Sequence, residues 1–232
     1  MVMKKKLLIT VLLYALAFFS NAQTGKVSIK FAPLALMDDI SMPTIQGGME
    51  VKLSNHFFWY NEVGIKYRKC VNELTDTSFI DSKGFKLKSE VRYYFNKTKI
   101  GIFKEPVAGL YLAGNLFYIN DNHNTKINYY YKKDSSITLQ DAFAVHKKVF
   151  GINLLGGFQH SIYKNFVIDM FAGIGIRIRV VNTENKEFNK DRDSLVQTID
   201  FSVLSIRNYV DAAGGTSIVP SITGGIRLCY NF

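Results

Sequence analysis

Cysteine, proline and long apolar runs are all scarce in this sequence. Two cysteines, Cys70 and Cys229, cannot form the disulfide framework that stabilises a small exported domain. Only 4 prolines leave room for long uninterrupted strands, and 17 glycines can supply the bends of those strands. No phosphate loop, nucleotide fingerprint or metal-ligand spacing occurs. The sequence therefore predicts no catalytic residue, no bound cofactor and no metal site.

The one long apolar run lies at the start of the chain. Three lysines at positions 4–6 precede an apolar core of about 13 residues at 7–19, which is typical of a signal peptide. An uncleaved anchor is the weaker alternative, because a spanning helix needs about 20 such residues. Small residues then predict cleavage after Ala22, which leaves residues 23–232 as the mature domain.

Basic residues outnumber acidic ones in the mature chain. The formal charge is +10 for the full sequence, and loss of the three lysines at 4–6 leaves 10 − 3 = +7. An exported protein of this charge is expected to meet anionic lipid head groups or polysaccharide rather than nucleic acid. Export also permits a disulfide. The strand arrangement predicted below separates Cys70 from Cys229 by far more than the roughly 7 Å between Cα atoms that a disulfide allows, so we expect no bond.

Apolar side chains alternate with polar or small ones in about eight segments of about 9 to 14 residues, which is strand periodicity. In residues 166–179, for example, one face is apolar while Asp169, Arg177 and Arg179 lie on the other. The same alternation covers 27–31, 44–53, 57–68, 85–95, 108–118, 150–159 and 221–232. The pattern predicts an all-β, antiparallel chain.

Short and long connections alternate between these segments from the third segment onward. Residues 54–56 and 163–165 are tight turns, 96–105 is a moderate connection, and 70–83, 120–144 and 182–218 are longer. In an up-and-down barrel with an even number of strands, every second connection lies at the same end. The pattern therefore predicts an eight-stranded transmembrane barrel with short periplasmic turns and long outer loops.

Strand length and aromatic placement fit a membrane barrel. About 9 to 11 residues cross a bilayer as a tilted strand, and only helices and closed barrels satisfy every backbone group in lipid. Aromatic residues occur at both ends of the apolar faces, as in the interfacial girdles of such barrels. Those on the side of the termini are Phe57, Trp59, Tyr93, Phe95, Phe158, Phe166, Tyr230 and Phe232, and those on the loop side are Tyr67, Tyr118 and Phe150.

The last strand ends on an aromatic residue, with Ile226, Leu228, Tyr230 and Phe232 on one face. This segment resembles the C-terminal assembly signal of Gram-negative outer-membrane proteins. Together with the signal peptide and the strand pattern, the chain resembles the small eight-stranded OmpA/OmpX-like barrels, without the peptidoglycan-binding domain that OmpA appends. The resemblance implies an outer-membrane location, recognition by the barrel-assembly machinery, and a monomer in contact with outer-membrane lipid and lipopolysaccharide. The first outer loop, at 38–42, is shorter than is common in this group.

Charged side chains dominate the face predicted to line the barrel interior. Eight strands enclose a space that side chains just fill, so buried charges there need partners. We expect Glu62 and Glu90 to share cations, and the network to plug the barrel rather than form a gated ion path. The predicted lumen charge network comprises Glu50, Glu62, Glu90, Asp169, Lys66, Arg92 and Arg227.

Further bases lie toward the loop end of the strands. A ring of arginine and lysine there would suit the phosphates of lipopolysaccharide, and a plain solvated rim is the alternative. The predicted basic outer rim comprises Arg68, Lys69, Lys86, Lys88, Lys147, Lys148, Arg177 and Arg179.

The sequence favours a non-enzymatic structural or surface-interaction role. Binding is expected at the long loops, where strands could also extend past the membrane and expose an edge. One alternative is an outer-leaflet lipid-modifying enzyme, for which His146 with Asp141 or with Ser135 and Ser136 is the one set available. Another is a soluble periplasmic barrel that binds an apolar ligand and has its faces inverted.

Overall fold

The computed structural model describes residues 27–37, 42–66, 80–95, 109–196 and 213–232. The predicted signal peptide, Cys70, and the rim residues Arg68 and Lys69 lie outside these ranges. The elements are β1 (Val27–Phe31), the 3-10 helix η1 (Pro33–Met37), β2 (Thr44–Lys52), β3 (Phe57–Lys66), β4 (Ile80–Tyr94), β5 (Leu110–Tyr131), β6 (Asp134–Tyr163), β7 (Phe166–Glu184), β8 (Asp193–Leu195) and β9 (Gly215–Asn231).

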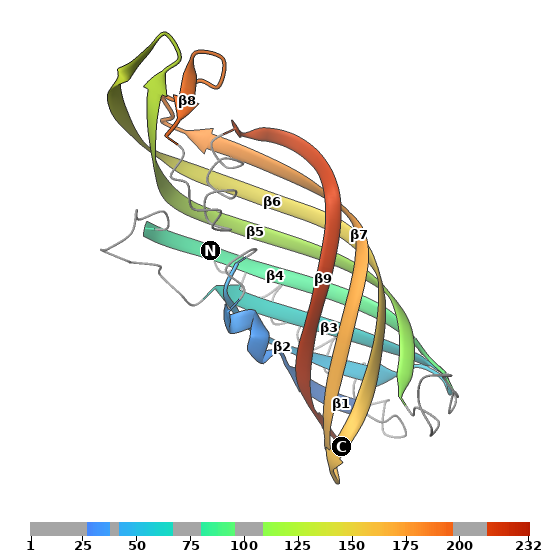
Figure 1. Ribbon diagram of the computed structural model, residues 1–232. Coiled ribbons are helices and arrows are strands. Elements are labelled where there is room, and N and C mark those ends of the chain that lie inside the picture. Colours follow the sequence, from blue (N-terminus) through green and yellow to red (C-terminus); the bar gives the residue numbers. More distant parts are fainter. Residues whose placement is uncertain (1–26, 38–41, 67–79, 96–108, 197–212) are drawn as a thin grey trace, which may run out of the picture.

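Eight of these strands close into an antiparallel barrel (Figure 1). Their order is β4-β3-β2-β1-β9-β7-β6-β5, and β5 pairs with β4 to complete the ring. The short β8 adds to β5 beyond the barrel, through the pairs Tyr129↔Leu195 to Tyr131↔Asp193. The predicted all-β, eight-stranded up-and-down barrel is confirmed. No helix among the described residues is both long and apolar enough to cross a membrane.

The strands are staggered as barrel closure requires. A row of paired residues that starts at Leu228 and passes once around the ring returns to β9 at Ile218, an offset of 228 − 218 = 10 residues. With about 3.3 Å per residue and about 4.8 Å between strands, this offset tilts the strands by about 40°. That tilt lies within the range known for closed barrels of this size.

The two faces of the wall differ sharply in polarity. Outward-facing Ile222 is 85% exposed and Ile174 is 69% exposed, whereas the inward-facing Arg227 is fully buried. The inverted arrangement of a soluble carrier barrel is therefore not the one observed. Aromatic rings pack together at both ends of the apolar wall, as between Phe166 and Tyr230 near the C-terminus and between Tyr118 and Phe150 at the other end.

The two predicted tight turns are present. Leu53 N donates to Phe57 O across the β2–β3 turn at 2.9 Å. The β6–β7 turn joins Tyr163 to Phe166, with Lys164 at a positive φ of 35°.

The prediction of a long loop at 120–144 is wrong. β5 and β6, which have 22 and 30 residues, stay paired from Leu110↔Phe158 to Tyr129↔Leu139 and turn at Lys132 and Lys133. In the 182–218 region, β7 runs to Glu184, β8 forms, and β9 begins at Gly215. Periodicity underestimates the length of these strands. Residues 120–126 belong to β5, but they are mostly polar on both faces and so lack the alternation expected of a strand. The hairpin rises beyond the barrel with β8 beside it (Figure 1).

β1 is short for a physical reason. Pro33 fixes its own φ and has no N–H, so the strand cannot continue past Ala32. η1 follows directly and lies between β2 and β9, with Ala32 N donating to Gln46 O at 3.1 Å. η1 thus ends just before the predicted short first connection at 38–42, of which only Met42 lies within the described residues.

Candidate functional site: a buried charge cluster below a packed extension

Arg92 on β4 holds three carboxylates together in the barrel interior. Its guanidinium lies 2.7 Å from Asp169 Oδ2 and 2.9 Å from Glu50 Oε2, and its Nε donates to Glu90 Oε2 at 3.0 Å. These residues come from β2, β4 and β7, so the contacts cross the interior. All four side chains are almost fully buried.

Arg227 on β9 forms the second centre of the cluster. Its Nε donates to Glu62 Oε2 at 3.0 Å and its Nη2 donates to Glu90 Oε1 at 2.6 Å. Arg227 therefore bridges Glu62 and Glu90, so these two carboxylates share one cation. Glu90 also accepts from Arg92. Lys88 Nζ lies 2.7 Å from the other oxygen of Glu62.

Lysine and tyrosine side chains complete the coordination of the acids. Lys30 Nζ lies 2.9 Å from Glu50 Oε2 and 3.0 Å from Asp169 Oδ2. Tyr111 donates its hydroxyl hydrogen to Asp169 Oδ1 at 2.7 Å, and Tyr60 donates to Glu62 Oε2 at 2.6 Å. Strong hydrogen bonds of this kind make buried carboxylates tolerable.

Aromatic rings also contact the cations. The Tyr60 ring has Arg92 Cζ at 4.5 Å and Arg227 Cζ at 4.6 Å from its centroid, and Arg227 lies 3.8 Å from the Phe171 centroid. Such cation–π contacts add about 2 kcal/mol when they are desolvated.

The cluster is electrically neutral. Its four carboxylates are matched by four cations, so 4 − 4 = 0. We name it the lumen cluster; its members are Glu50, Glu62, Glu90, Asp169, Lys30, Lys88, Arg92 and Arg227.

One predicted member lies elsewhere. Lys66 Nζ pairs with Asp121 Oδ1 at 2.6 Å and not with Glu62 or Glu90. Register explains the difference, because Lys66 sits at the end of β3, four residues above Glu62, whereas Lys88 is directly opposite Glu62. Lys30 and Lys88 are both present in the inward-facing pattern, but strand periodicity alone does not reveal their partners.

The predicted basic outer rim is only partly a surface feature. Lys86 is buried, and Lys88 belongs to the lumen cluster, because the even-numbered residues of β4 face inward. Arg179 Nη2 donates to Ser217 Oγ at 3.0 Å on the neighbouring strand. Lys148 is exposed and Lys147 is half-buried. Arg177 is half-buried on the inward face of β7.

The C-terminal residues occupy the outer face near the base of the barrel. Tyr230 stacks edge-on between Phe166 and Phe232, with ring centroids 5.2 and 5.0 Å apart. Phe232 N donates to Val27 O at 3.0 Å, which fixes the last residue to the first strand. Ile226 and Leu228 precede them on the same face. Cys229 points inward and is buried.

Above the barrel the β5–β6 hairpin has a small apolar core of its own. The residues 185–192 between β7 and β8 fold over the inner face of the hairpin and contribute Phe188. The Tyr129 and Phe188 rings pack edge-on at 5.7 Å. The buried members of this core are Ile127, Tyr129, Phe143, Val145, Val181 and Phe188. We name the β5–β6 hairpin from this apolar core to its tip, together with residues 185–195, the extension.

Two aspartates hold the covering segment in place. Asp141 Oδ2 accepts from the backbone N–H groups of Glu187 and Phe188, each at 2.8 Å. Asp193 accepts from Arg192 Nε at 2.7 Å and from Asn189 N at 2.8 Å. The hydrogen bonds from Arg192 lower the pKa of the Asp193 carboxyl below its usual value.

The residues considered for catalysis do not meet. Asp141 is occupied by backbone N–H groups, whereas His146 Nδ1 lies 2.9 Å from Asn122 Oδ1. Five residues separate Asp141 from His146 on β6, about 16 Å at the rise of a strand, and they point to opposite faces. Ser136 bonds Asp134 near the tip of the hairpin. Within the described ranges, no group of His, Cys, Asp or Glu side chains could hold a metal ion.

The tip of the hairpin does not present a flat strand edge. Between the pairs Tyr129↔Leu139 and Tyr131↔Asp134, residues 135–138 of β6 face Tyr130 alone, so the strand bulges. Asp134 Oδ1 also takes the Ser136 N–H at 3.0 Å. Bulges of this kind discourage pairing with further strands.

Comparison with known proteins gives little more. No protein-family model matches the sequence, and no curated protein matches it. Among solved structures, the chain is similar to a major outer membrane protein from Thermus thermophilus, with 11% identity and a TM-score of 0.37 over 90% of this chain and 99% of that one. A TM-score of this size supports no inference about role.

Proposed function

We propose that this chain is a non-enzymatic, OmpA/OmpX-like barrel of the outer membrane of a Gram-negative bacterium. It is exported by the cleaved signal peptide at 1–22 and inserted as a monomer by the barrel-assembly machinery. It serves the envelope as a structural element and presents its extension for surface interactions.

The outward apolar wall between two aromatic levels carries this proposal. The levels are eight residues apart on two strands, Phe85 to Tyr93 (93 − 85 = 8) and Phe150 to Phe158 (158 − 150 = 8). At the strand tilt given above, eight residues rise by about 20 Å, close to the roughly 25 Å apolar band of outer-membrane barrels. Exposed isoleucines in water would instead favour aggregation.

The lumen cluster supports a closed interior. Side chains of four cations and four acids meet across the barrel, and seven of the eight are at most 4% exposed. A permeating ion would have to break several charge-assisted hydrogen bonds. The cluster is thus a structural plug, and the barrel does not conduct ions.

Contact with lipopolysaccharide is expected near the loop end of the barrel. Lys148 is exposed and Lys147 is half-buried on β6, just above the Tyr118–Phe150 aromatic pair. Lys148 shares the outward face of β6 with Phe150, so its ammonium group is the one expected to meet outer-leaflet phosphates, whereas Lys147 lies on the inward face with Val145 and Val149. The extension above them is the part that a partner outside the cell would meet.

Membrane fractionation followed by gel electrophoresis in SDS tests the proposal. The protein should be in the outer-membrane fraction, and unboiled samples should migrate differently from boiled ones because a closed membrane barrel resists SDS. Reconstituted in planar bilayers, it should show no channels. A soluble periplasmic protein without a heat-dependent shift would refute the proposed location, and steady conductance altered by Glu62→Gln would refute the plug.

A further inference from the structure

The barrel wall is interrupted between β1 and β9. β1 covers only the last part of β9, through the pairs Phe31↔Leu228 to Ser28↔Asn231. Above Leu228, none of the described residues pairs as a strand with this edge of β9. Pro220, which has no N–H to donate, lies in that stretch, as is usual for an edge strand. We name the gap beside β9 above Leu228 the seam. η1 lies in this gap and contacts both β2 and β9.

A small cavity lies under η1 at the seam. Its volume is about 100 Å³, and it extends from Leu34 and Ala35 of η1 to Gln46, Glu62 and Lys88 inside. The Lys88 side chain is 22% exposed, whereas its partner Glu62 is 1% exposed, so Lys88 is the accessible end of the lumen cluster. Polar groups of the interior can therefore be reached from the wall.

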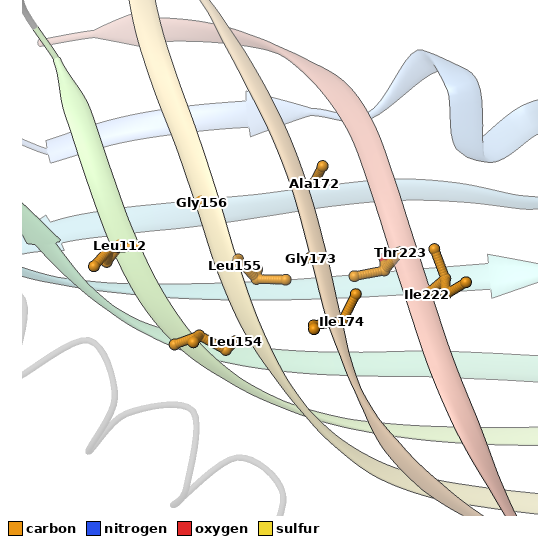
Figure 2. Close-up of a pocket in the computed structure, with 9 residues that line it drawn as sticks. All are labelled: Leu112, Leu154, Leu155, Gly156, Ala172, Gly173, Ile174, Ile222 and Thr223. Atoms are coloured by element: carbon orange, nitrogen blue, oxygen red, sulfur yellow. The ribbon is translucent and has the colours of Figure 1, made fainter. Parts of the chain in front are cut away.

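An apolar groove on the outer wall runs toward the same seam. It has a volume of about 410 Å³ and crosses β5, β6, β7 and β9, with Leu112, Leu154, Ile174 and Ile222 as its larger side chains (Figure 2). Its floor follows one register row of small residues, in which Gly156 pairs with Ala172.

The groove and the cavity adjoin each other on β9. Ala172 pairs with Gly224, which extends the row of small residues to the seam. Gly224 lines the cavity, and Thr223 lines both spaces. The two spaces therefore share Thr223 as a lining residue, with the apolar groove outside and the more polar cavity inside.

The backbone does not require glycine in the floor of the groove. A Cβ at Gly156 would meet only Leu112 Cδ2, at 4.0 Å, and Gly156 is not at a positive φ. Glycine weakens a strand relative to residues with side chains. Its presence here keeps the groove open without any benefit to the fold of β6.

We propose that the groove and the seam cavity together bind one amphiphile of the membrane, with its hydrocarbon chain in the groove and an uncharged, hydroxyl-bearing head in the cavity. This inference rests on the proposed membrane location. It adds a ligand site to a barrel whose interior is otherwise closed.

The charge balance of the lumen cluster selects an uncharged head. With four acids and four cations already paired, a further anion or cation would leave an excess buried charge. A hydroxyl group suits the cavity better, because Lys88, whose side chain is 22% exposed, can donate to its oxygen while Lys88 Nζ keeps its 2.7 Å contact with Glu62 Oε1. The hydroxyl would accept a hydrogen bond from Lys88 Nζ.

The size of the cavity limits the head. A volume of 100 Å³ holds the equivalent of about three waters at roughly 30 Å³ each. A glycerol-sized group fits, and a sugar-phosphate head does not. The expected ligand class is a single-chain neutral lipid such as a monoacylglycerol.

Photolabelling of the full-length mature protein in amine-oxide micelles tests the site. Three probes carry the same diazirine-containing C16 chain, as the monoacylglycerol, the free fatty acid at pH 8.5 and the methyl ester. A hydrogen bond to a charged group should favour the monoacylglycerol by about tenfold over the ester, measured as adduct by intact mass. Adducts should map to the β6, β7 and β9 peptides that line the groove.

Two matched variants separate the groove from general lipid contact. Gly156→Leu fills the groove and should reduce labelling by about tenfold, as expected when a buried chain loses its pocket. Gly114→Leu makes the same change on the same outer wall, at a glycine that does not line the groove and has open space for a Cβ. It should leave labelling unchanged.

Equal labelling by the three probes, or equal loss in both variants, would overturn the inference. Preference for the fatty acid would likewise contradict the uncharged head. The heat-dependent gel shift checks that each variant is folded, and the probe comparison on the unchanged protein remains decisive if Gly156→Leu does not fold. Failure of the shift in the unchanged protein would count against the membrane location instead.

Discussion

Replacing Arg227 with methionine should destabilise the folded barrel by about 3 to 5 kcal/mol, the usual cost of leaving buried charges without their partner. Arg227 donates to Glu62 at 3.0 Å and to Glu90 at 2.6 Å, and its side chain is fully buried. After the substitution, 4 − 1 = 3 cations face four carboxylates. Methionine retains much of the packing against Phe171, so the loss is mainly electrostatic.

A double-mutant cycle isolates this electrostatic effect. Glu62→Gln removes one carboxylate, so the cluster in Arg227→Met/Glu62→Gln again balances, with three cations and three carboxylates. Coupling of about 2 kcal/mol is expected, and the double variant should be no less stable than Arg227→Met alone.

The assay is reversible urea unfolding of the barrel in lipid vesicles, analysed by linear extrapolation. Lys148→Met serves as control, because this exposed lysine should contribute less than about 0.5 kcal/mol. The reasoning is refuted if Arg227→Met costs under about 1 kcal/mol or if the two substitutions are simply additive.

Three further predictions concern the parts of the chain outside the barrel wall. Asp141→Asn should weaken the hydrogen bonds to residues 187 and 188, and trypsin should then cut the covering segment several-fold faster than in the unchanged protein; equal rates would contradict the role of this carboxylate. Because its folded pKa is lowered, Asp193 stabilises the extension above the ordinary aspartate pKa of 3.8 and loses this contribution only as pH falls through the lower folded value. Protection factors for the amides of residues 189–193 should therefore be the same at pH 4 as at neutral pH and fall at lower pH, and a fall already at pH 5 would be inconsistent with the Arg192 contact. Replacing Lys148 with glutamine should weaken lipopolysaccharide binding by about fivefold in a vesicle assay, whereas unchanged binding would leave it as part of a solvated rim.

Strand periodicity is sufficient to predict the barrel and the orientation of its faces. A side-chain period of two places Arg227 inside and Leu228 outside whatever the exact register, because one face must be apolar. The same argument fails in the hairpin beyond the barrel. There β5 and β6 remain paired while residues 120–126 are mostly polar on both faces, so their composition resembles that of a loop.

The partners within the interior cannot be derived in the same way. Register decides which charges meet, and a shift of a few residues moves a lysine to another level. Periodicity therefore assigns Lys66 to Glu62, although it pairs with Asp121, and places Lys88 on the rim, although it pairs with Glu62. The sequence gives no sign that Tyr60 and Tyr111 donate hydrogen bonds to the cluster, since an inward tyrosine has the same periodicity as an apolar residue.

The lumen cluster joins residues from both ends of the chain, and this has a consequence for folding. Lys30 and Asp169 are 139 positions apart, and Glu62 and Arg227 are 165 positions apart. Contacts of such high sequence separation form late, because a long loop must close before they can be gained. Until β9 meets β1, these two long-range pairs are absent, and the charges keep only their partners on neighbouring strands, Glu50 for Lys30 and Lys88 for Glu62. Assembly should therefore proceed as one cooperative closing step, without a stable half-inserted intermediate.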